Sequence, residues 1–397
     1  MRDSGSSPAA TLDVAAPASL APAAARHLPS LDGLRGLAIL LVIVHQLDLL
    51  TKPVGLGAHA FSAVGAVGWV GVQLFFVLSG FLITGILVDS RGAANYFSGF
   101  FARRVLRIFP LYYATLLVAF VVLPLFVSPS PPLAHDRHHQ IWLWTYLSNW
   151  VNPYEAGSRA FPHFWSLAVE EQFYLVWPFL LRRQTPQRCL ALCAAIAVAS
   201  LGVRCVMVAK SAPSEAIYCF SVTRMDALAL GAIGAAALRV PPLRARLERV
   251  GGTRLWLFGI ALGVVGAGLT HGYSLEHAAG NTVGYTFLAL TFAAFVVGAA
   301  LHDGGGTRGW PTLLRARPLT LVGKYSYGMY VLHKPLHDFV GKPLLRRFGL
   351  DASSAPGIAV AYIAVAAVVT YAAAFASYHL FEARFLALKS KFAPSTR

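Results

Sequence analysis

Long apolar stretches recur along the whole chain, and they limit its possible folds more than any other feature. A helix that crosses a lipid bilayer needs about 20 mostly apolar residues. About ten stretches meet this requirement, and they cover residues 35–51, 66–88, 108–127, 161–182, 189–209, 217–238, 254–270, 281–301, 319–340 and 356–381. We therefore predict an all-α fold, a polytopic integral membrane helical bundle of about ten transmembrane helices.

The composition excludes a soluble or disulfide-stabilised protein. Of the 397 residues, 56% are hydrophobic and only 13% are charged, whereas about 25% are charged in soluble globular proteins. The four cysteines are too few for a disulfide scaffold, and their spacing predicts no metal site. The surplus of 33 Lys and Arg over 17 Asp and Glu follows membrane topology, because most basic residues fall in segments on one side. We expect both termini in the cytoplasm and no nucleic-acid partner.

The chain divides into three parts. Residues 1–28, rich in Ala, Ser and Pro, are expected to form a disordered cytoplasmic tail, 29–388 the membrane domain, and 389–397 a second cytoplasmic tail. Membrane lipids are the expected surroundings of the middle part.

Polar and ionisable side chains within the predicted spans are the main candidates for a functional site, because each costs about 2.5 kcal/mol or more to insert. At about 1.5 Å of rise per residue, they lie about 9–15 Å below the outer surface. They are His45, Glu170, Glu171, Arg224, Asp226 and His333. We expect a polar chamber in the outer half of the membrane; pairing between helices is the alternative. Arg224 and Asp226 are two residues apart, so each needs a partner on another helix.

Two further patterns suggest ligand contacts. Glu170 and Tyr174 share a helical stripe with two other aromatic residues, which either packs against neighbours or lines a sugar-sized cavity. Arg104 and Arg107 lie on one side of the helix that begins the third span, at the opposite face of the membrane. They either anchor the topology or bind phosphate through paired hydrogen bonds.

Six strings stand in a definite order along the chain: Leu31–Leu41 (LDGLRGLAILL), Phe75–Thr84 (FFVLSGFLIT), Arg103–Pro110 (RRVLRIFP), Phe164–Pro178 (FWSLAVEEQFYLVWP), Arg224–Gly231 (RMDALALG) and Gly323–Pro335 (GKYSYGMYVLHKP). They resemble the motifs of the membrane acyltransferase-3 family of bacterial O-acyltransferases, over about residues 31–385. The resemblance implies an enzyme that moves acyl groups, commonly acetyl, onto sugar hydroxyls of cell-envelope or secreted glycans. It also implies that Arg104 and Arg107 handle the acyl-CoA donor and that Glu170 is the family's glutamate.

The family's catalytic motif, an arginine and a histidine on the first span, is altered here. The pattern has ten residues between the two, so Arg35 points to position 46, which is occupied by Gln46. His45 stands one position earlier, about 100° around the helix. Either a local distortion lets His45 act as the base, or Gln46 replaces the base and the enzyme is impaired or organised differently. We predict that His45 is the catalytic residue, as general base on the acceptor hydroxyl or as transient carrier of the acyl group.

The predicted function is therefore transfer of an acyl group, acetyl in the first instance, from acyl-CoA to a hydroxyl of a glycan or lipid-linked sugar, in the bacterial inner membrane. No permanently bound cofactor is expected. The predicted catalytic residues are His45, Arg35 and Glu170; the donor-binding residues are Arg104 and Arg107; the acceptor-binding residues are Arg224, Asp226, Tyr174 and His333. The alternative is a transporter or flippase that uses the same polar groups as a pathway, although no inverted repeat is recognisable.

Overall fold

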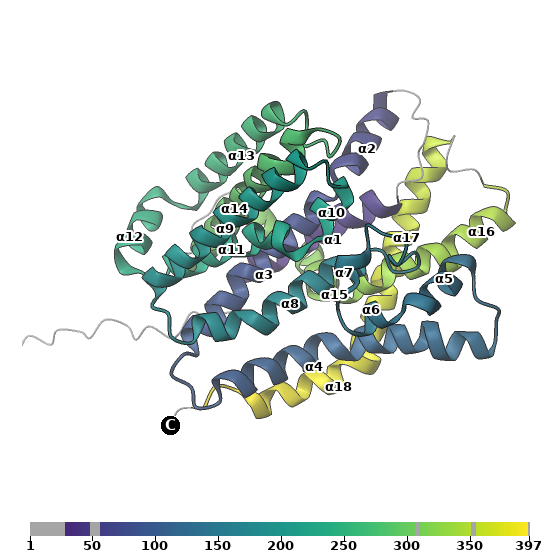
Figure 1. Cartoon of the computed structure of the whole chain (residues 1–397), viewed down its shortest axis with the longest axis horizontal. Coiled ribbons are helices and arrows are strands. Elements are labelled where there is room, and N and C mark those ends of the chain that lie inside the picture. The colour runs from purple at the N-terminus through teal and green to yellow at the C-terminus, as the bar shows by residue number, and fades with distance from the viewer. Residues whose placement is uncertain (1–27, 48–55, 306–309, 351–354, 396–397) are drawn as a thin grey trace, which may run out of the picture.

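The computed structural model describes residues 28–47, 56–305, 310–350 and 355–395, and all regular structure in these ranges is helical (Figure 1). The long helices are α1 (Pro29–Leu47), α3 (Val70–Asp89), α4 (Tyr96–Leu117), α8 (Phe164–Leu181), α9 (Pro186–Ala209), α11 (Ser221–Ala237), α13 (Gly252–Leu269), α14 (Tyr285–Gly305), α15 (Arg317–Leu336) and α17 (Pro356–Ser377). The shorter ones are α2 (Leu56–Val67), α5 (Pro131–His139), α6 (Ile141–Trp144), α7 (Ser148–Val151), α10 (Ser214–Cys219), α12 (Pro241–Val250), α16 (Lys342–Arg347) and α18 (Ala383–Ala387). Single π or 3-10 turns cover Val118–Val122, Leu123–Leu125, Gly280–Gly284, Trp310–Arg315, His337–Gly341, Tyr378–Glu382 and Leu388–Phe392.

A long helix occupies each of the ten stretches that the sequence marked as apolar, which confirms the all-α membrane fold. Within the described residues, eight helices are long and apolar enough to span a membrane. The other two are α8 and α15, whose polar residues, such as Glu170, Glu171 and Lys334, lower their mean hydropathy. The number of helices that cross the bilayer and the orientation of the termini stay predictions. The expected tail at 1–28 lies outside the described residues except for its last residue.

The centre of the bundle is the contact between α3 and α11, where glycines let the two backbones lie very close together. A Cβ atom added to Gly80 would lie 1.9 Å from the carbonyl oxygen of Leu228, and one added to Gly231 would lie 2.0 Å from that of Val77. Small residues allow such close packing in membrane helices, where van der Waals contact replaces the hydrophobic effect. Helix α1 crosses α15 in the same way, because a Cβ on Gly323 would lie 1.8 Å from the carbonyl oxygen of Asp32.

Helices at the rim present large apolar side chains to their surroundings. Val198 on α9, Phe258 on α13 and Val368 on α17 are exposed, and each belongs to a helix that is long and apolar enough to span a membrane. In water such a surface would aggregate, whereas lipid chains cover it at no cost. The chain is a multi-pass membrane protein.

The last described residues return to the start of α4. Helix α18 and the turn Leu388–Phe392 pack along α4, which forms the lower edge of the bundle in Figure 1. A cavity lies beside α4 here, and the side chains that line it are described next.

Candidate active site

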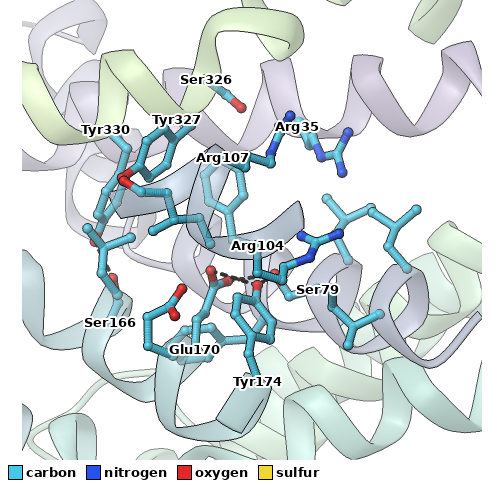
Figure 2. Close-up of a pocket in the computed structure, with 18 of the residues that line it drawn as sticks. Arg35, Ser79, Arg104, Arg107, Ser166, Glu170, Tyr174, Ser326, Tyr327 and Tyr330 are labelled. Carbon is cyan, nitrogen blue, oxygen red and sulfur yellow. Dashed lines mark hydrogen bonds between the residues drawn. The ribbon is translucent and has the colours of Figure 1, made fainter. Parts of the chain in front are cut away.

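A cavity of about 260 Å³ lies where α1, α3, α4, α8 and α15 meet (Figure 2). Five of the six strings that carry the family resemblance contribute to its wall. Its charged and hydroxyl-bearing residues are Arg35, Ser79, Arg104, Arg107, Ser166, Glu170, Glu171, Tyr174, Ser326, Tyr327, Tyr330 and Lys389. The site is therefore a polar pocket enclosed by otherwise apolar helices.

Glu170 is held in this cavity by two hydroxyl groups. Ser79 on α3 donates a hydrogen bond to its Oε1 atom at 2.6 Å, and the Tyr174 hydroxyl lies 3.1 Å from Oε2 and 3.0 Å from the Ser79 oxygen. Because Tyr174 is four residues after Glu170, both side chains project from one side of α8. Figure 2 shows this triad facing Arg104. The stripe of Glu170 and aromatic residues that the sequence predicted thus lines a cavity and also packs against neighbouring helices.

Cations gather opposite the triad. The Arg104 guanidinium lies 5.7 Å from the centre of the Tyr174 ring, a cation–π distance. Arg107 lines the cavity one helical turn further along α4, and Arg35 reaches it from α1, where its Nη1 donates to the Asp32 carboxylate at 2.7 Å. The sequence assigned Glu170 to an outer chamber and these arginines to the opposite face of the membrane. The structure instead joins them, because α8 runs beside α4 and presents its carboxylates to it.

His45 lies outside the walls of this cavity. Its Nδ1 atom is 2.7 Å from the carbonyl oxygen of Gly65. A carbonyl can only accept, so Nδ1 carries a hydrogen, and the neutral form of such a ring has its lone pair on Nε2. The tautomer is the one a general base requires.

Gln46 points to a different neighbour from His45, as the rotation of about 100° per residue demands. Its side-chain amide lies 2.9 Å from Nε2 of His333. The Nδ1 atom of His333 is 2.7 Å from the carbonyl oxygen of Tyr330, so it too carries the hydrogen. The Gln46 atom in this contact is Oε1. The ring of the buried His163 packs against His333 with 4.8 Å between centres.

Arg224 and Asp226 also lie apart from the cavity, and each has the partner on another helix that the sequence required. Arg224 donates to the Gln73 side chain on α3, and its guanidinium carbon lies 4.1 Å from the centre of the Tyr285 ring. Asp226 forms an ion pair with Arg204 on α9 at 2.7 Å, with both side chains fully buried. The prediction that each residue needs a partner from elsewhere is confirmed. Their roles in acceptor binding stay predictions.

Several residues of these networks were not among the sequence candidates, and three of them are instructive. Ser79 lies within a motif string, but a serine in an apolar span carries no charge to draw attention. Arg204 is a charge within a span and could have been nominated as the partner of Asp226. Lys389 falls after the last predicted span, where no periodicity connects it to the cavity.

The fold and the cavity define a multi-pass membrane protein with a buried site that combines arginines and carboxylates. The family model described as "Acyltransferase domain" matches residues 28–378, and the chain belongs to this acyltransferase family. The predicted resemblance is thereby confirmed.

Curated relatives agree with the family. The chain is 30% identical to "O-acetyltransferase OatA" of Staphylococcus aureus (strain NCTC 8325 / PS 47) over 336 residues, which cover 79% of this chain and 51% of the relative. It is 30% identical to "Putative peptidoglycan O-acetyltransferase YrhL" of Bacillus subtilis (strain 168) over 335 residues, which cover 78% and 49%. The chain spans about half the length of these relatives. No solved structure matches it.

Proposed function

We propose that this protein is an integral membrane O-acyltransferase that moves an acyl group, acetyl in the first instance, from acyl-CoA to a hydroxyl of a glycan or glycolipid. The observation that carries the proposal is the cavity in which Arg35, Arg104 and Arg107 face Glu170 across an otherwise apolar bundle. The family and the names of the two relatives support the same reaction class. The name of the Bacillus relative makes peptidoglycan the first acceptor to try.

The three arginines would bind the anionic part of the donor. Guanidinium groups hold phosphate oxygens through paired, charge-assisted hydrogen bonds. Three cations face the carboxyl groups of Glu170 and Glu171, so an anionic ligand would improve the charge balance of the pocket. Because acyl-CoA is made in the cytoplasm, this side of the cavity would open there, and the bacterial inner membrane is the proposed location.

Acyl transfer forms an ester C–O bond between the acceptor oxygen and the acyl carbon and breaks the thioester C–S bond. The proton of the acceptor hydroxyl passes to a base, and CoA leaves as a thiolate that takes up a proton. We assign the base to His45, whose Nε2 lone pair is free among the described contacts; general base catalysis contributes about 10²–10⁴-fold. Glu170, fixed by Ser79 and Tyr174, would orient the acceptor through another of its hydroxyl groups, because His45 lies outside the cavity that Glu170 lines.

Residues outside the cavity would shape the acceptor side. Arg224 is buried with its Nε and Nη1 atoms unpartnered in the described structure, so it can donate to acceptor oxygens. His333 would fix the outer half of α15 against α1 through Gln46. Asp226 would act indirectly, by holding α11 against α9.

The test is release of free thiol from acetyl-CoA by the purified protein in liposomes, with peptidoglycan fragments as acceptor. Wild type, Glu170→Gln, Arg104→Ala and His45→Ala are compared. Thiol release that needs the acceptor and falls in all three variants is expected. A transporter or flippase would consume no thioester, so the absence of release across several acyl donors and glycans would refute the enzyme and favour that alternative.

A further inference from the structure

The segment 388–395 lies beyond the family match, which ends at residue 378, and it is fastened to the start of α4. The Asn95 side chain donates from Nδ2 to the carbonyl oxygen of Ala393 at 2.8 Å and accepts from the Ser395 N–H at 3.0 Å. The Ala94 N–H adds a bond of 3.1 Å to the carbonyl oxygen of Ser395. Asn95 therefore clamps the segment instead of capping α4.

Arg103 supplies a second attachment, because its guanidinium donates to the carbonyl oxygen of Phe392. The three arginines of the string Arg103–Pro110 thus have different contacts. Arg103 holds the segment, whereas Arg104 and Arg107 line the cavity. Between the attachments and α18 stands Lys389, whose side chain also lines the cavity.

Lys389 brings the cations of the cavity wall to four, against the carboxyl groups of Glu170 and Glu171 and that of Asp32, which pairs with Arg35. Lys391, two residues along the same turn, is exposed and is not part of the wall. An apolar bundle gains nothing from gathering four cations at one place. Their convergence is explained when a ligand brings several negative charges, and phosphate groups bind lysine as well as arginine.

We infer that segment 388–395 completes the donor site and that Lys389 is a fourth contact for the phosphate groups of the donor. The inference rests on the proposed acyl-CoA donor and extends it to a residue outside the family match. Asn95 and Arg103 act as positioning residues, since they touch the segment and not the cavity.

The experiment measures equilibrium binding of CoA and of pantetheine, which lacks phosphate, to the full-length protein in nanodiscs. Lys389→Ala is expected to weaken CoA binding about tenfold, the contribution of one charge-assisted hydrogen bond. Lys389→Arg should bind CoA as the wild type does, and the matched control Lys391→Ala should change it less than about twofold, as expected for an exposed charge. Pantetheine binding should be the same in all of them.

Asn95→Ala tests the attachment of segment 388–395 separately from the charge of Lys389. We expect it to weaken CoA binding, and to have little further effect in the Lys389→Ala background, because two steps of one interaction are not additive. Equal CoA affinity in Lys389→Ala and Lys391→Ala would overturn the inference. So would an equal loss of pantetheine binding, because the effect would then not involve phosphate.

If acyl-CoA is not the donor, the binding measurements give a different pattern. If the wild type binds no CoA, the donor assignment falls, and the same variants are compared with inorganic pyrophosphate as the probe. Weaker pyrophosphate binding in Lys389→Ala alone would support the phosphate site. Equal binding, or none, would overturn it.

Discussion

Replacing Asp226 with alanine should weaken the packing of α11 against α9 and leave the residues that line the cavity unchanged. The Asp226 carboxylate pairs with Arg204 at 2.7 Å and accepts from the Thr286 hydroxyl at 3.0 Å, with both members of the ion pair fully buried. Asp226→Ala removes both interactions and leaves the buried Arg204 guanidinium without a counter-ion, bonded only to two carbonyl oxygens and the Thr286 hydroxyl. Breaking one side of a buried ion pair costs about 3–5 kcal/mol, and we expect a loss of unfolding free energy in that range.

The assay is unfolding of the detergent-solubilised protein, with CoA binding measured in parallel. The double variant Arg204→Met with Asp226→Leu should recover most of the stability, because the unpaired charge is removed. CoA affinity should be unchanged in the double variant, since neither residue lines the cavity. A single variant that keeps its stability but loses acyl transfer to the glycan would refute this reasoning, and would place Asp226 in acceptor binding as the sequence suggested.

Three other predictions test separate parts of the structure. Gly80→Ala should cost about 1–3 kcal/mol through overpacking, because its Cβ would meet the Leu228 carbonyl oxygen at 1.9 Å, whereas Gly202→Ala, with nothing within 4 Å, should be neutral in the same unfolding assay. Ser79→Ala should lower thiol release several-fold while leaving CoA affinity intact, because it frees the Glu170 carboxylate; unchanged release would show that the triad does not orient the acceptor. His45→Ala should lower thiol release about 10²–10⁴-fold and Gln46→Ala only slightly, so loss in Gln46→Ala alone would move the essential position one residue along α1.

The architecture could be predicted because it depends on apolar length, which is a local property. Each of the ten apolar stretches contains a long helix. Polar composition separates α8 and α15 from the other eight, since their interior contacts require groups that lower hydropathy. The requirement that Arg224 and Asp226 find partners elsewhere also followed from helix geometry, and Gln73 and Arg204 meet it.

The grouping of the polar residues could not be predicted in the same way. Depth along a span says how far a residue lies from the surface but not which helix it faces. His45 and Gln46 have nearly the same depth, yet one bonds to Gly65 and the other to His333. Glu170 faces Arg104 rather than the histidines, because α4 and not α1 lies against that side of α8. Which helices are neighbours is decided by packing across the whole bundle.

The low hydropathy of α8 and α15 has a consequence for how the chain enters the membrane during synthesis. Three polar side chains described on these two helices find partners on segments made earlier. Glu170 meets Ser79 on α3, Tyr330 meets Ser166 on α8, and His333 meets Gln46 on α1. A helix that emerges from the ribosome after its partners can leave the translocon already shielded. The order of the chain thus allows part of the polar surface of α8 and α15 to be shielded as soon as each helix is made.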